Sequence, residues 1–170
     1  MVTFEESNMS FSFEDADAFH IEEQELYKKI IGAKTCECIV LFNEKVMLIE
    51  AKSSFPQPQK NGDDNSDFKN FAESIACKFS DSLVYYTATY LKRHLPDTLP
   101  VNLQAIHLSK HDYEFCLIIF GHKKDWLPPV LDQMKKSMKK MLKLWGIKDS
   151  SVKVINEHMA LSKGMITGYL

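Results

Sequence analysis

Hydrophobic and polar positions follow two different periods along the chain, and each change of period marks an expected element. Short apolar runs rich in β-branched residues, typical of strands, lie at Cys36–Phe42, Val46–Ala51 and Tyr113–Gly121. Longer stretches with apolar residues three and four apart, typical of amphipathic helices, lie at Ser66–His94 and Leu127–Trp145. This mixture of strands and helices favours an α/β fold.

Weaker patterns fill most of the remaining chain. Apolar spacing predicts a further helix at Asp17–Ile31, and Val101–Leu108 and Val152–Ile155 are expected to be strands. Residues 1–16 are acidic and read as irregular, with a short strand at Met9–Phe13 as an option. The tail that ends at residue 170 shows no clear pattern.

The segment Ser53–Asp67 combines two prolines, one glycine and many polar residues, which indicates a mobile loop. Such a loop would either close over a substrate or be a disordered insertion. No second domain is indicated, so residues 1–170 are interpreted as a single domain. Its expected architecture is a mixed central sheet, begun by the hairpin at residues 36–52, with helices on both faces.

The first two strands contain three charges that apolar strands normally exclude, namely Glu37, Glu50 and Lys52. Side chains alternate along a strand, so Glu50 and Lys52 share one face. If Asn43 and Glu44 form a two-residue turn, counting outward places Glu37 opposite Glu50 on that same face. A four-residue turn keeps Glu37 on this face, whereas a three-residue turn moves it to the other one.

Two carboxylates this close repel each other unless a shared proton or a divalent cation lies between them. A lysine beside such a pair suggests a Mg²⁺ site with a basic group near an attacked phosphate. The alternative is a solvated strand end that carries an ordinary Glu–Lys ion pair.

An acid, a hairpin turn and then the sequence Ile49-Glu50-Ala51-Lys52 resemble the PD-(D/E)XK nuclease superfamily, which has the restriction-endonuclease-like fold. The resemblance covers roughly residues 17–108. Glu37 stands where the family usually has Asp, the "PD" pair is missing, and the usual extra first strand is absent or displaced. The resemblance implies hydrolysis of phosphodiester bonds in DNA or RNA with Mg²⁺ or Mn²⁺.

The resemblance also assigns roles to individual residues. Glu37, Glu50 and the Ala51 carbonyl would hold the ion, and Lys52 would orient the attacking water. The family's preceding helix often supplies another acid, for which Glu23 is the candidate, with Glu22 as its substitute. The helix after the (D/E)XK strand often supplies a Lys or Gln, and Lys78 is in that position.

Two of these assignments have plain structural alternatives. Glu23 could be an acid tolerated near a helix N-terminus, where the helix dipole favours negative charge. Lys78 could be a lysine that lies beside the apolar face and extends its ammonium group to water.

Charge is distributed unevenly, although the net charge is only −2. Residues 1–30 contain eight acids against two lysines, and residues 121–150 contain eight lysines against three aspartates. On the predicted helix at 127–145, Lys135, Lys136 and Lys139 lie mostly off the apolar stripe, so they are candidate nucleic-acid contacts. The alternative is a solvated helix face.

Several other classes of protein are not indicated by the sequence. The four cysteines form no C-x-x-C pair, so a zinc ribbon is not expected, and they read as buried and reduced. The six histidines lack metal-ligand spacing, and no P-loop, G-x-S-x-G or Rossmann glycine pattern occurs. No signal peptide or membrane-length apolar run is present, so a soluble, cytoplasmic protein without a membrane partner is expected.

The leading hypothesis is therefore a metal-dependent nuclease, with DNA preferred over RNA as the substrate. A second hypothesis keeps the same fold but makes it a catalytically inactive module that binds nucleic acid or protein. A third is a scaffold that uses the Met-rich helix at 127–145 to contact a protein partner or a second copy of the chain.

Overall fold

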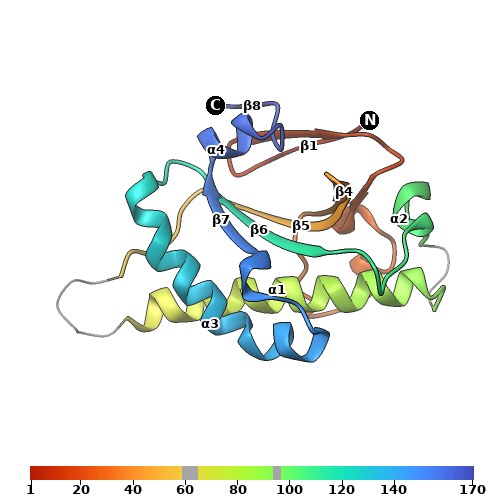
Figure 1. Ribbon diagram of the computed structural model, residues 1–170. Coiled ribbons are helices and arrows are strands. Elements are labelled where there is room, and N and C mark those ends of the chain that lie inside the picture. The colour runs from red at the N-terminus through yellow and green to blue at the C-terminus, as the bar shows by residue number, and fades with distance from the viewer. Residues whose placement is uncertain (59–64, 94–96) are drawn as a thin grey trace.

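The computed structural model describes residues 1–58, 65–93 and 97–170, and it contains two β-sheets and two long helices (Figure 1). The strands are β1 Val2–Glu6, β2 Met9–Phe13, β3 Ala18–His20, β4 Cys38–Phe42, β5 Lys45–Lys52, β6 Tyr113–Ile119, β7 Val152–Asn156 and β8 Gly168–Tyr169. The α-helices are α1 Ser66–Tyr90, α2 Val101–Ala105, α3 Leu127–Trp145 and α4 Glu157–Ser162. Short 3-10 turns are η1 Ile21–Glu23, η2 Tyr27–Lys29, η3 Lys124–Trp126 and η4 Asp149–Ser151.

Five strands form a mixed central sheet in the order β3-β4-β5-β6-β7. β4 is antiparallel to β3 and β5, whereas β6 is parallel to β5 and β7. Parallel neighbours need a crossover connection, and α1 and α3 lie in the two crossovers. The predicted α/β class with a mixed sheet is confirmed. β6 is an inner strand, as its apolar sequence predicts, and Phe115–Ile119 is buried throughout.

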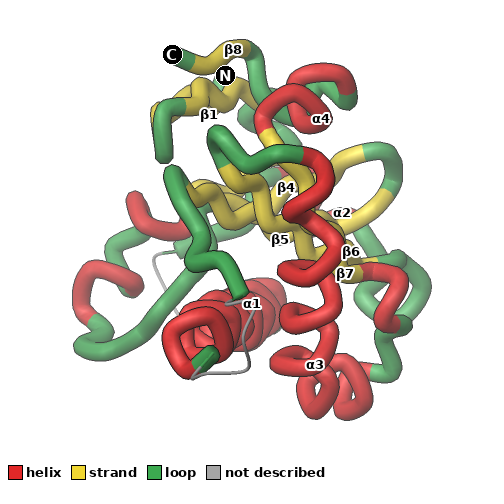
Figure 2. The backbone as a smooth tube through the Cα atoms, turned by 90° about the vertical axis from the view of Figure 1, so that its left-hand side faces the viewer, coloured by secondary structure: helices red, strands yellow, loops and turns green. Residues whose placement is uncertain are grey.

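The molecule has three layers. α1 and α3 cover one face of the central sheet, and a small antiparallel sheet of order β1-β2-β8 lies over the other (Figures 1 and 2). The expectation of helices on both faces is therefore wrong, because only the short α4 accompanies the small sheet. Met9, Phe11 and Phe13 alternate along β2, and all three are buried in one cluster with Val40 and Ile49 of the central sheet.

The N-terminal residues are more regular than expected. The optional strand at Met9–Phe13 is confirmed, but Val2–Glu6 pairs with it along its whole length, so residues 1–16 are not irregular. The patternless tail forms α4 and then β8, which pairs with β2. These pairings join the two ends of the chain, and neither end has a strong pattern of its own.

The helix predicted at Asp17–Ile31 is wrong. Ala18–His20 is a strand paired with β4, and the following residues form only the turns η1 and η2. Phe19 is buried against the sheet, but Ile30 and Ile31, which end the predicted helix, are exposed. Pairing with the free edge of β4 outweighs a weak local helical preference.

The strand predicted at Val101–Leu108 is also wrong, because Val101–Ala105 forms the short helix α2. Leu103 and Ile106 are buried, whereas Val101 is exposed. A spacing of three between buried residues suits one helical turn and does not suit a strand.

The two long helices agree well with their patterns. α3 has the predicted bounds, and Gly146 ends it in the left-handed conformation at φ +66°. α1 begins at Ser66 as predicted and ends at Tyr90, and His94 lies outside the described residues. Residues 59–64 of the predicted mobile loop also lie outside them. Before that gap, Phe55 is buried and packs edge-on against Phe68 and Phe71 of α1.

All four cysteines are free thiols, as expected. Cys36, Cys38 and Cys116 are buried, whereas Cys77 is exposed on α1, so the expectation of four buried cysteines is wrong for Cys77. Among the described residues, no helix is both long enough and apolar enough to span a bilayer.

Candidate active site

The charged residues of the hairpin converge where β5 ends, under helix α1. Lys52 Nζ lies 2.6 Å from Glu50 Oε1 and 4.0 Å from Glu37 Oε1. Lys78 Nζ, which comes from α1, lies 2.8 Å from Glu50 Oε1 and 3.7 Å from Glu37 Oε1. The predicted convergence of Glu37, Glu50 and Lys52 is confirmed, and Lys78 joins them. We call these four residues the carboxylate–lysine cluster.

The hairpin turn brings the two carboxylates together. Phe42 pairs with Lys45, so Asn43 and Glu44 form the two-residue turn assumed in the count, and both have positive φ, at +48° and +63°. Two positive φ angles match a type I′ turn, whose twist suits a hairpin.

The ladder between β4 and β5 departs from the expected register at one point. It ends at the pair Cys38–Ile49, and the Glu37 amide also donates to the Ile49 carbonyl at 3.0 Å. Glu37 and Cys38 thus both face Ile49, as in a β-bulge, and Glu37 is not the ladder partner of Glu50. The carboxylates still meet, because both reach the same two lysines.

Ser82 clamps α1 against the strand that carries Glu37. Its hydroxyl accepts a hydrogen bond from the Cys36 amide at 2.7 Å and donates to the Lys78 carbonyl at 2.7 Å. Lys78 is therefore fixed in height relative to the start of β4. The sequence analysis missed Ser82, although a polar residue on the apolar face of α1 was a visible signal. Thr35 was missed too, and its buried hydroxyl has no hydrogen-bond partner among the described residues.

Burial dominates the electrostatics of the cluster. Glu50 is 0% exposed and Glu37 is 4% exposed. Burial, then the nearby Glu50, raise the pKa of Glu37 to about 8, although Lys78 opposes this rise. Burial also raises the pKa of Glu50 despite the attraction of Lys78 and Lys52. Burial opposes the charged form of Lys78, but Glu50 and Glu37 prevail and raise its pKa.

One carboxylate oxygen of the cluster is left over. Both ammonium groups approach Glu50 Oε1, while the buried Glu50 Oε2 has no hydrogen-bond partner among the described residues. An unpaired buried carboxylate oxygen is costly, so this atom offers a place for a cation or a water molecule.

A backbone oxygen points to the same side. The Lys52 carbonyl accepts from the Phe120 amide, on the β6 side of β5. Because successive carbonyls of a strand alternate in direction, the Ala51 carbonyl points to the β4 side, where Glu37 lies. Glu37, Glu50 and this carbonyl are hard oxygen donors, and Mg²⁺ is commonly held by one or two carboxylates while water and substrate complete its shell.

The donor set fits Mg²⁺ or Mn²⁺ in its chemistry, although it is small. In the part of the chain that the structure describes, no three His, Cys, Asp or Glu side chains gather as a metal site. Lys52 and Lys78 together carry the charge of one divalent ion and contact the same oxygens. Binding of an ion therefore requires these ammonium groups to move.

Glu23 does not lie where the sequence analysis expected it. The predicted helix is absent, and the Glu23 side chain is 67% exposed and pairs with Lys28 at 3.2 Å. Glu22, its substitute, is half-buried, and its negative charge acts on both Glu37 and Lys78, so it is the nearer acid. Losing the helix changed which of the two neighbours faces the hairpin.

The lysines of α3 are separate from the cluster. Lys136 and Lys139 are exposed and Lys135 is half-buried, and no ion pair joins any of them to an acid among the described residues. α3 packs beside α1 and against β7, on the far side of the sheet from β3 and β4 (Figure 1). The structure therefore does not bring these lysines to the carboxylates.

Comparisons with protein families, with curated proteins and with solved structures found no match to this chain.

Proposed function

We propose that this chain is a divalent-metal-dependent nuclease with a restriction-endonuclease-like core, which hydrolyses phosphodiester bonds of DNA or RNA. One observation carries the proposal: two buried carboxylates and two lysines meet at the end of β5. The acid–hairpin–Glu-x-Lys order, followed by α1 and the parallel strand β6, supports the family resemblance. β3 in place of the preceding helix and Glu37 in place of Asp are departures from the family pattern.

Each residue of the cluster has a distinct role in this proposal. Glu37, Glu50 and the Ala51 carbonyl would hold Mg²⁺ or Mn²⁺. The ion, when bound, lowers the pKa of a bound water and offsets negative charge on the attacked phosphate. Lys52 would orient that water and stabilise the charge that develops, and Lys78 would neutralise a phosphate oxygen.

Access to the cluster determines where a substrate would approach. The carboxylates are buried, whereas the side chains of Lys52 and Lys78 are 24% and 20% exposed. A phosphate would therefore meet the two ammonium groups first. Drawing them away from Glu50 toward the phosphate would free the carboxylate oxygens for the ion.

A cleavage assay tests the proposal directly. Linear DNA, circular DNA and RNA are incubated with the chain and with Mg²⁺, Mn²⁺ or EDTA. We expect metal-dependent cleavage that Glu50→Gln and Lys52→Ala abolish, with Lys52→Ala sparing substrate binding because it acts mainly on the transition state. Glu73→Gln and Lys69→Ala, on the exposed surface of α1, are the matched controls. Cleavage that survives Glu50→Gln would contradict the proposal.

A second function is favoured by the balance of charge in the cluster. Two lysines and two acids neutralise one another, and Glu50 has no exposed surface. These features also suit a purely structural network in an inactive binding module. Melting temperature separates the two functions: stabilisation by Mn²⁺ that Glu37→Ala removes supports the metal site, and no stabilisation at millimolar Mn²⁺ supports the module.

A further inference from the structure

A groove of about 620 Å³ runs beside β7, away from the carboxylate–lysine cluster. Residues of α4 and its following turn line one side of β7, and Leu131 and Lys135 of α3 line the other. Its floor includes Met47, whose neighbours are in the cluster under the small sheet, whereas the carboxylates face α1. The groove is thus a separate feature of the opposite sheet face.

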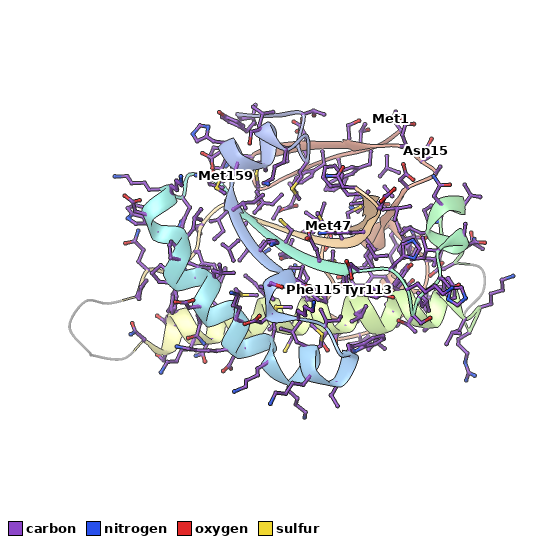
Figure 3. All side chains as sticks on the ribbon, viewed as in Figure 1. Met1, Asp15, Met47, Tyr113, Phe115 and Met159 are labelled. Carbon is purple, nitrogen blue, oxygen red and sulfur yellow. The ribbon has the colours of Figure 1, made fainter. Side chains whose placement is uncertain are left out.

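The floor of the groove is apolar and adaptable. It includes Met47, Cys116, Ile155, Met159 and Met165, and Figure 3 labels Met47 on β5 and Met159 on α4. Methionine side chains are flexible and polarisable, so they fit apolar bodies of different shapes. The volume lies within the roughly 300–1,000 Å³ that small-molecule sites occupy.

The rim of the groove is positively charged. Its ionised side chains are Lys45, Lys135, Lys153, Lys163 and Glu114. Lys45 and Glu114 pair with each other at 2.7 Å, which leaves the other three lysines without an acidic partner among the described residues. The groove therefore has excess positive charge and no unpaired acid.

Two of these lysines act directly on the floor. Burial raises the pKa of the Cys116 thiol to about 12, and Lys163 and Lys153 both oppose that rise. Lys153 and Lys163 are exposed, so their ammonium groups are available to a ligand. They stand above an apolar floor with no competing anion beside them.

We propose that this groove binds a small amphiphilic anion, with an apolar body on the methionine floor and a carboxylate or phosphate head between Lys153 and Lys163. Charge complementarity selects this occupant, because a neutral apolar ligand would leave the lysines unused and a cation would be repelled. The proposal is independent of nuclease activity, since no residue of the carboxylate–lysine cluster lines the groove.

Methionine-methyl NMR and calorimetry test the proposal on the full chain. The probes are decanoate and decyl phosphate below their micelle concentrations, with decanol and inorganic phosphate as the neutral and headgroup-only controls. We expect both anions to shift the methyl signals of Met47, Met159 and Met165, and to leave those of Met134 and Met138 in the other core unchanged. The tighter of the two anions identifies the head group.

Charge reversal distinguishes the groove from any other site. The double variant Lys153→Glu/Lys163→Glu should weaken decanoate and decyl phosphate binding at least tenfold. Lys143→Glu, exposed on α3 and outside the groove, should leave binding unchanged. Equal binding of decanol and decanoate, unchanged affinity in the double variant, or saturation by an acidic peptide but by neither anion would overturn the proposal.

Discussion

Replacing Lys78 with methionine isolates the charge that α1 contributes to the carboxylate–lysine cluster. Methionine keeps most of the aliphatic length of lysine, so apolar packing changes little. The substitution removes an ammonium group 2.8 Å from Glu50 Oε1 and leaves Lys52 at 2.6 Å. Glu50, with no exposed surface, then has one cationic partner in place of two.

The expected loss of stability is large. Removing one partner from a buried ion pair costs about 3–5 kcal/mol, and the remaining Lys52 places this case near about 3 kcal/mol. In a chain of this length, each kcal/mol lowers the melting temperature by about 2–4 °C, so a fall of about 6–12 °C is expected. Lys69→Met, exposed on the same helix, should change stability by less than about 0.5 kcal/mol.

Urea unfolding followed by circular dichroism measures these changes, and a double-mutant cycle with Glu50→Gln measures the coupling. Glu50→Gln should recover part of the loss, because the poorly compensated buried charge is then absent. Mg²⁺ should raise the melting temperature of Lys78→Met more than that of the wild type, since the cation no longer competes with Lys78. A loss below about 1 kcal/mol together with additive effects in the cycle would refute the ion network itself.

Three further predictions concern pH, the basic helix and the hairpin turn. The pKa of Glu37 is raised from 4.5 to about 8, so the folded state binds the extra proton and stability should fall as pH rises from about 4.5 to 8. Glu37→Gln should flatten this decline in urea titrations at several pH values, and an unchanged slope would show that Glu37 is not the group responsible. If the chain binds nucleic acid through α3, changing Lys135, Lys136 and Lys139 to Glu should weaken binding and reduce its salt dependence, which falls by about 0.9 log units per phosphate contact. An unaltered affinity and salt slope would exclude α3 as the docking surface. Glu44→Gly should raise stability by up to about 1 kcal/mol in thermal melts, because glycine adopts the positive φ of +63° at this turn position without strain; a lower melting temperature would argue against the two-residue turn.

Much of the candidate site could be predicted because it depends on short-range spacing. The distance in sequence from the turn to Glu50 and Lys52 determines which sheet face they share. The bulge at Glu37 could not be predicted, because it depends on how Cys36 docks on Ser82 of α1. The assignment of Glu23 failed for a related reason, since it assumed a helix where β4 instead gains a strand partner.

The fold divides in a similar way. Long periodic segments such as α1 and α3 were predicted closely, because many apolar positions specify one helix face. Short segments were predicted poorly, since a few apolar residues fit a strand or a helical turn equally well. Val101–Ala105 and Ala18–His20 are of this kind, and their conformations depend on the neighbours against which they pack.

The sequence by itself determined the hairpin, the two long helices, the inner strand β6 and the shared face of Glu50 and Lys52. These features follow from periodicity and from the geometry of consecutive residues, which act locally. Only the tertiary structure decided that a small sheet covers the second face and that Ser82 sets the position of Lys78. Those outcomes depend on contacts between segments far apart in sequence, where the free energy of burying one surface against another selects the partner.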